Sequence, residues 1–108
     1  MHDPLADLEA WYTNVCDGDW EHQFGIHIET LDNPGWSVNI NIAETPIADK
    51  EFSKVKHERG DCNWVHCWVE DETFKGRGGP NNLREILNIF AIWCSPTDEN
   101  TCKRRSDG

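Results

Sequence analysis

The densest group of reactive side chains in this 108-residue chain lies at positions 16–22, in the run CDGDWEH. Its acidic residues Asp17, Asp19 and Glu21 alternate with other residues, as carboxylates do at the start of an EF-hand calcium loop. Such a loop also needs glycine at its sixth position and glutamate at its twelfth. Counted from Asp17, these positions hold His22 and Ile28, so the run does not predict a calcium site.

Histidines offer a second chemistry, the binding of a transition metal. His22, His57 and His66 could supply imidazole ligands, and Asp17 or Asp19 could add a carboxylate. The spacing of these residues along the chain does not match a known metal-binding motif. The set of possible ligands nevertheless leaves open an alternative function as a small metal-dependent hydrolase. The interpretation that we prefer involves no catalytic residue, no metal and no cofactor.

The five cysteines do not indicate a metal or redox motif, because no C-x-x-C pair occurs among them. Their odd number excludes a fully paired set of disulfides. We expect Cys67 and Cys94 to be small core residues. Cys67 follows His66, but neighbours on a strand point to opposite faces, so a cysteine–histidine nucleophile is not predicted.

Six tryptophans are many for a chain of this length, and tryptophan is enriched at binding hot spots. Trp20 stands among acidic residues, which predicts an exposed anchor with an acidic rim. Trp64 and Trp68 share one face of a predicted strand, whereas we assign Trp11, Trp36 and Trp93 to the core. The hypothetical partner-binding residues are Asp17, Asp19, Trp20, Glu21, His22, Trp64 and Trp68.

The chain has a formal net charge of -10, from 20 acidic and 10 basic residues. This charge repels nucleic acids, so we expect no direct binding of DNA or RNA. The negative charge would attract a basic protein partner and speed its approach. An acidic composition can also have no role other than keeping a small protein soluble. No apolar run approaches the ~20 residues of a membrane span, and the chain starts without a secretory signal pattern. We therefore expect a cytoplasmic protein without membrane contact.

The elements that must position these residues are organised around an alternating stretch at 24–42. Apolar residues occupy every second position on both sides of a break at 32–35, which predicts an antiparallel hairpin with one apolar and one polar face. Within the break, Pro34 and Gly35 suit the two central positions of a type II turn, where Gly35 would have a positive φ.

Further elements follow from capping signals and periodicity. Asp3 and Pro4 predict a helix start, and Gly79 and Pro80 predict another. In the strand at 62–70, both faces are apolar or aromatic, so it is either covered on both sides or presents exposed tryptophans. We expect helices at 4–15 and from 80 to about 94, strands at 52–58, 62–70 and 73–75, a turn at 59–61 and a flexible connector at 76–79.

These elements predict one α+β domain over residues 1–95. It would contain an antiparallel meander of about four to five strands, with an N-terminal and a C-terminal helix packed on one face. The other face would then be wet or would meet a partner. Residues 96–108 are polar and unpatterned, and we expect them to be disordered.

Several stretches resemble the immunity protein 53 family of bacterial polymorphic toxin systems. The most specific are CDGDWEH at 16–22 and NPGW at 33–36, and the resemblance runs from about Leu5 to Trp93. The other matching stretches are WY at 11–12, GI at 25–26, TLD at 30–32 and GGP-x-NL at 78–83.

The resemblance implies a small cytosolic protein that binds and neutralises a cognate toxin domain, which is often encoded by the neighbouring gene. Many such toxins are nucleases with a basic working face, which suits an acidic inhibitor. Residues 16–22 would then bind the toxin or be purely structural, with Asp17 and Asp19 capping turns. A different alternative is a homodimer whose Trp64 and Trp68 face is self-complementary.

Overall fold

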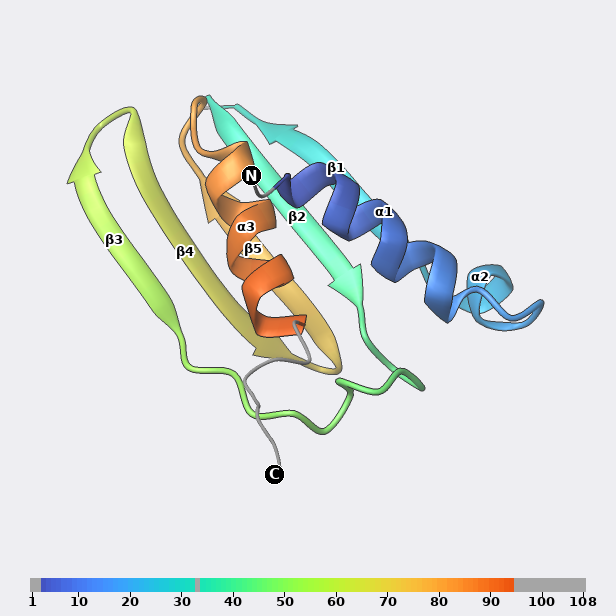
Figure 1. Cartoon of the computed structure of the whole chain (residues 1–108). Helices are drawn as coiled ribbons and strands as arrows, with labels where there is room; N and C mark the ends of the chain where they lie inside the picture. Colours follow the sequence, from blue (N-terminus) through green and yellow to red (C-terminus); the bar gives the residue numbers. More distant parts are fainter. Residues whose placement is uncertain (1–2, 33, 95–108) are drawn as a thin grey trace.

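A computed structural model describes residues 3–32 and 34–94. Two long helices lie on one face of a five-stranded antiparallel sheet (Figure 1). The predicted α+β class and the placement of both terminal helices on one face are therefore confirmed. The elements are α1 Pro4–Val15, α2 Trp20–Gln23, β1 Ile26–Leu31, β2 Gly35–Asn41, β3 Val55–Gly60, β4 Asn63–Glu70, β5 Thr73–Gly78 and α3 Leu83–Cys94.

The strand order is β1-β2-β5-β4-β3, so consecutive strands are not always neighbours. Residues 42–54 carry the chain from the end of β2 past the sheet to its opposite edge (Figure 1). From there β3, β4 and β5 form a meander that returns to β2. As a result β5 is the central strand, while β1 and β3 are the two edges.

The predicted hairpin forms, and its apolar face meets the helices. Ile26 pairs with Ile40 and Ile28 pairs with Val38, which are the apolar positions of the alternation. The predicted positive φ at Gly35 is wrong, because Gly35 belongs to β2 and pairs with Leu31. A Cβ atom at Gly35 would collide with the carbonyl oxygen of Gly78, so close strand packing is what requires glycine there.

Residues 76–79 are not a flexible connector, which corrects the prediction. β5 continues to Gly78, and both Gly76 and Gly78 are buried beneath α3. A Cβ atom at Gly76 would lie well under 3.0 Å from Cγ2 of Ile86 on α3. These glycines therefore let the helix approach the central strand closely.

Three predicted boundaries also shift. β3 begins at Val55 instead of residue 52, and the predicted turn at 59–61 starts later because Arg59 and Gly60 belong to β3. α3 begins at Leu83 instead of Pro80. Its start is held by the buried Asn82, whose side chain accepts from Trp64 N (3.3 Å) and donates to Glu85 (2.9 Å).

The core lies between the helices and the sheet. Trp11, Trp36 and Trp93 pack against it as predicted, and Cys67 is buried. Burial raises the pKa of Cys67 to about 12, so this thiol is not a nucleophile at neutral pH. The described part of the chain contains no helix that is long and apolar enough to cross a membrane. The predicted tail at 96–108 lies outside the described residues.

Candidate partner-binding surfaces

The acidic run at 16–22 folds into a turn that its own carboxylates hold together. Asp17 Oδ1 accepts hydrogen bonds from the backbone N–H groups of Asp19 (3.0 Å) and Trp20 (2.9 Å). The Glu21 carboxylate accepts from the N–H groups of Asp17 (3.0 Å) and Gly18 (2.9 Å). These two carboxylates therefore act as caps of the turn, which is the structural alternative stated for Asp17. The bonds from Trp20 and Asp19 lower the pKa of Asp17.

Trp20 is buried, so the prediction of an exposed anchor is wrong. Its side chain is 2% exposed, and its Nε1 donates to the carbonyl oxygen of Ala43 at 2.9 Å. Its ring lies edge-on to Trp11, with the ring centroids 5.9 Å apart. The charged neighbours suggested exposure, but Asp17, Asp19 and His22 are exposed while the indole between them is buried. Burying a large ring whose N–H has a partner is strongly favourable.

Asp19 and His22 remain exposed in this turn, and the side chain of Asp19 makes no capping hydrogen bond. His57 and His66 lie on other strands, β3 and β4. Within residues 3–32 and 34–94, no group of three or more histidine, cysteine or acidic side chains could hold a metal ion. The geometry of the described residues therefore gives no support to the hydrolase alternative.

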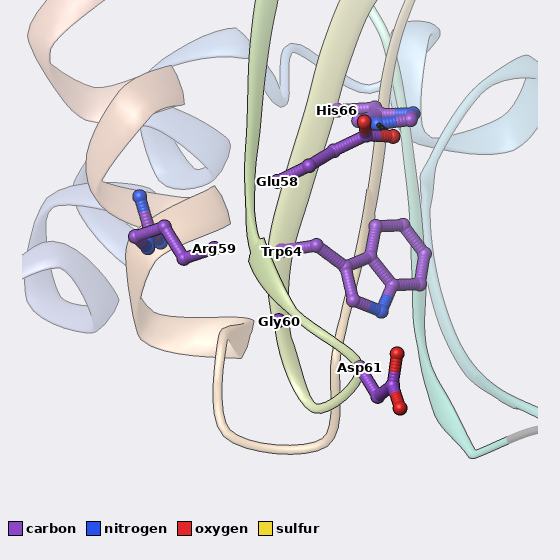
Figure 2. A pocket seen from close by; sticks show the side chains of 6 residues that line it. All are labelled: Glu58, Arg59, Gly60, Asp61, Trp64 and His66. Atoms are coloured by element: carbon purple, nitrogen blue, oxygen red, sulfur yellow. Dashed lines mark hydrogen bonds and ion pairs between the residues drawn. The ribbon is translucent and has the colours of Figure 1, made fainter.

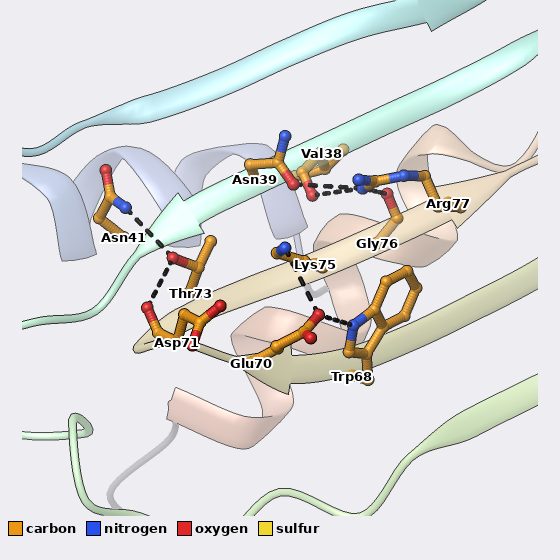
Figure 3. A network of polar contacts seen from close by, with 10 residues as sticks. All are labelled: Val38, Asn39, Asn41, Trp68, Glu70, Asp71, Thr73, Lys75, Gly76 and Arg77. Atoms are coloured by element: carbon orange, nitrogen blue, oxygen red, sulfur yellow. Dashed lines mark hydrogen bonds and ion pairs between the residues drawn. The ribbon is translucent and has the colours of Figure 1, made fainter.

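Trp64 and Trp68 lie on the face of the sheet that the helices leave open, here called the uncovered face. Its centre consists of the side chains of β4 and β5 that alternate with core residues: Trp64, His66, Trp68, Glu70, Thr73, Lys75 and Arg77. The two tryptophans are half-buried among these neighbours, and no described helix covers them; Figure 3 shows Trp68 and Figure 2 shows Trp64. The alternative of a strand covered on both sides does not apply to β4.

A polar network fixes the side chains around Trp68 (Figure 3). The Arg77 guanidinium lies over the Trp68 ring, 5.4 Å from its centroid, and donates to Asn39 Oδ1 at 3.2 Å. Trp68 Nε1 donates to Glu70 at 3.2 Å, and Lys75 Nζ lies 3.5 Å from the same carboxylate oxygen. The Trp68 bond and, second, the charge of Lys75 lower the pKa of Glu70. Trp68 is thus held in one orientation by neighbours on two strands.

Trp64 borders an open hollow of about 640 Å³ near the turn between β3 and β4 (Figure 2). His66 Nε2 lies 3.1 Å from Glu58 Oε2, and the His66 ring stands edge-on to Trp64. Arg59 points to the other side of the sheet, where its guanidinium pairs with Glu85 of α3 at 2.6 Å. The hollow is therefore lined by an indole, an imidazole and carboxylates.

The structure does not bring the two groups of candidate residues together. Trp20 packs on the helix-covered side of the sheet, against Trp11 of α1. Trp64 and Trp68 lie on the uncovered face. The single acidic, tryptophan-bearing surface expected from the sequence is therefore two separate regions.

The net charge is concentrated in one half of the molecule, a feature that the sequence reasoning missed. Up to Asp49 the chain has ten acidic residues and no lysine or arginine, whereas residues 50–94 have seven of each sign. The first segment forms α1, α2, β1 and β2, which lie side by side, and we call it the acidic half (Figure 1). The distribution of charge along the chain is the signal that could have revealed it.

A comparison with protein families yields a match to the model of immunity protein 53 over residues 5–95. Comparisons with curated proteins and with solved structures yield no match. The match covers every helix and strand of the fold almost entirely, from α1 to the end of α3. The chain belongs to the immunity protein 53 family.

Proposed function

We propose that this protein neutralises a bacterial toxin domain by binding it, without catalysing a reaction. The observation that carries the proposal is membership of an immunity protein family over the whole described fold. The toxin is the C-terminal domain encoded by the neighbouring gene, and the complex forms in the cytoplasm.

The uncovered face is the surface proposed for the main contact. Trp68 and Arg77 at its centre are residue types that dominate binding energy at protein interfaces. Both are held in place before binding, so ordering them costs little conformational entropy. The exposed Asp19 and His22 belong to the acidic half, where they attract a basic partner from a distance instead of forming its central contact.

Growth rescue combined with affinity measurement tests this function. The neighbouring toxin domain is expressed in a sensitive cell with the wild-type protein, with Trp68→Ala or with Tyr12→Ala, and each purified pair is titrated. Tyr12 is the matched control, because it is an aromatic residue of α1 with 40% exposure that lies away from the uncovered face. Trp68→Ala should weaken binding by about 2 kcal/mol or more, roughly thirtyfold, and reduce rescue. Tyr12→Ala should bind as the wild type does.

Absence of both rescue and complex, for the neighbouring toxin and for a panel of related domains, would contradict the function itself. Rescue and affinity that are unchanged in Trp68→Ala would contradict only the placement of the contact on the uncovered face. A free protein that is a dimer through Trp64 and Trp68, and that keeps this dimer in the presence of toxin, would also contradict that placement.

A further inference from the structure

We infer that the outer edge of β1 pairs with an extended, basic segment of the toxin domain, which adds a sixth strand to the sheet. This inference rests on the proposed function and specifies how the partner is held. β1 and the strands of the uncovered face belong to the same sheet (Figure 1). A strand added at β1 would therefore bring the rest of the toxin domain beside the uncovered face.

Among the described strands, β1 has a neighbour on one side only, so half of its backbone groups have no partner in a described strand. Asn41 N donates to Gly25 O at 3.1 Å, and this bond sets the alternation along the hairpin. In an antiparallel ladder, hydrogen-bonded pairs recur at every second residue. His27 and Glu29, two and four positions after Gly25, therefore direct their backbone groups toward β2. The N–H and C=O groups of Ile26, Ile28 and Thr30 point away from β2, where they can bind an incoming strand.

The two edges of the sheet differ in how well they resist such pairing. β3 carries Lys56, His57, Glu58 and Arg59 in succession, all exposed, and its register shifts between Glu58 and Gly60. Charges and bulges are the features by which proteins protect an edge strand. β1 has a regular register, Glu29 as its one charged residue besides His27, and an isoleucine at position 28 that is 40% exposed. The edge at β1 is therefore the accessible one.

Charge selects the occupant of this edge. β1 lies within the acidic half, which contains ten acidic residues and no lysine or arginine. A second copy of the chain would place two such halves against each other, and their repulsion disfavours a dimer through β1. An extended segment rich in lysine and arginine instead meets a complementary potential, so the partner is a basic segment of another protein.

The test compares the same substitution at the two edges. Ile28→Lys places a charge on β1, and His57→Lys places one at the corresponding position of β3, since Ile28 pairs with Val38 and His57 with Val65 on the helix-covered side. Ile28→Lys should weaken binding of the toxin domain by about tenfold or more, whereas His57→Lys should leave it unchanged. If Ile28→Lys does not fold, Thr30→Pro removes an outward N–H without breaking a bond to β2.

Amide hydrogen exchange of the wild-type protein supplies a second readout. In the free protein the amides of Ile28 and Thr30 should exchange quickly while those of His27 and Glu29 are protected, and binding of the toxin domain should slow the exchange of Ile28 and Thr30.

A complex that forms with Ile28→Lys as tightly as with the wild type, and that leaves the amides of Ile28 and Thr30 of the wild type unprotected, would overturn the inference and leave the proposed function intact. Absence of any complex would overturn both. A free dimer in which these amides are already protected would assign the edge to a second copy and overturn the inference.

Discussion

The Trp20 indole is buried in the middle of an acidic run of the chain. Three of the six residues around it in the run at 16–22 are acidic and a fourth is histidine, and this suggested an exposed indole. The Trp20 ring is instead enclosed, with its N–H bonded to Ala43 and Phe24 packed beside it at 6.0 Å between centroids. Sequence alone cannot show which way a four-residue helix faces, because its orientation depends on contacts with residues more than twenty positions away.

Trp20→Ala should therefore reduce stability and affect binding only through folding. Removing a fully buried tryptophan and leaving its cavity typically costs about 3–5 kcal/mol. Chemical denaturation monitored by circular dichroism measures this loss, with the exposed Tyr12→Ala as a control expected to cost much less. A stable Trp20→Ala variant that has lost toxin binding would contradict the burial of this residue.

Asp17 should make the stability of the turn depend on pH. Its pKa is lowered in the folded state by the N–H groups of Trp20 and Asp19, so the carboxylate stabilises the fold at neutral pH. This contribution is lost as the pH falls through the lowered pKa. The stability difference between the wild type and Asp17→Asn should thus shrink in acid, as measured by denaturant unfolding at several pH values. Asp19→Asn is the control, since that side chain makes no capping bond, and an equal pH effect in both variants would contradict the assignment.

At the scale of elements, periodicity located most of the fold but misjudged β5. The alternations at 24–42 and 62–70 carry one face of large apolar residues, and both segments form strands with the predicted faces. β5 has Phe74 followed by Gly76 and Gly78 on its covered face, and glycine is typical of turns. Its strand character follows from the close approach of α3, a tertiary contact that local patterns do not contain.

Gly76→Ala should destabilise the protein because the new Cβ would overlap Cγ2 of Ile86. Overpacking of this kind typically costs about 1–3 kcal/mol. Gly60→Ala on the edge strand β3 is the matched control, since a Cβ there would meet nothing within 4 Å. The measurement is a double-mutant cycle with Ile86→Leu, which removes the overlapping methyl group and should recover part of the loss. Equal stabilities of Gly76→Ala and Gly60→Ala would show that α3 does not approach β5 as described.

At the scale of the whole molecule, the sequence predicted the fold class and that Trp64 and Trp68 share one face of a strand, but it left open whether that face is covered and did not locate the acidity. A total charge of -10 does not say where along the chain the acidic residues lie. In three dimensions the unbalanced negative charge lies around α1, α2, β1 and β2, while Arg77 lies over the Trp68 ring of the uncovered face and Lys75 pairs with the neighbouring Glu70. The acidic half is thus proposed to steer the partner and to offer it the edge of β1, whereas the aromatic contacts are proposed for the uncovered face.

The most direct test of the account is the association of the purified toxin domain from the neighbouring gene with this protein, followed in real time at low and high salt. We expect a stoichiometric complex that protects growing cells, with an association rate that falls steeply as salt screens the acidic half and a dissociation rate that changes little. Protection of the cells without any complex would contradict the central claim that the protein neutralises its toxin by binding. A complex whose association rate does not depend on salt would contradict the role assigned to the acidic half.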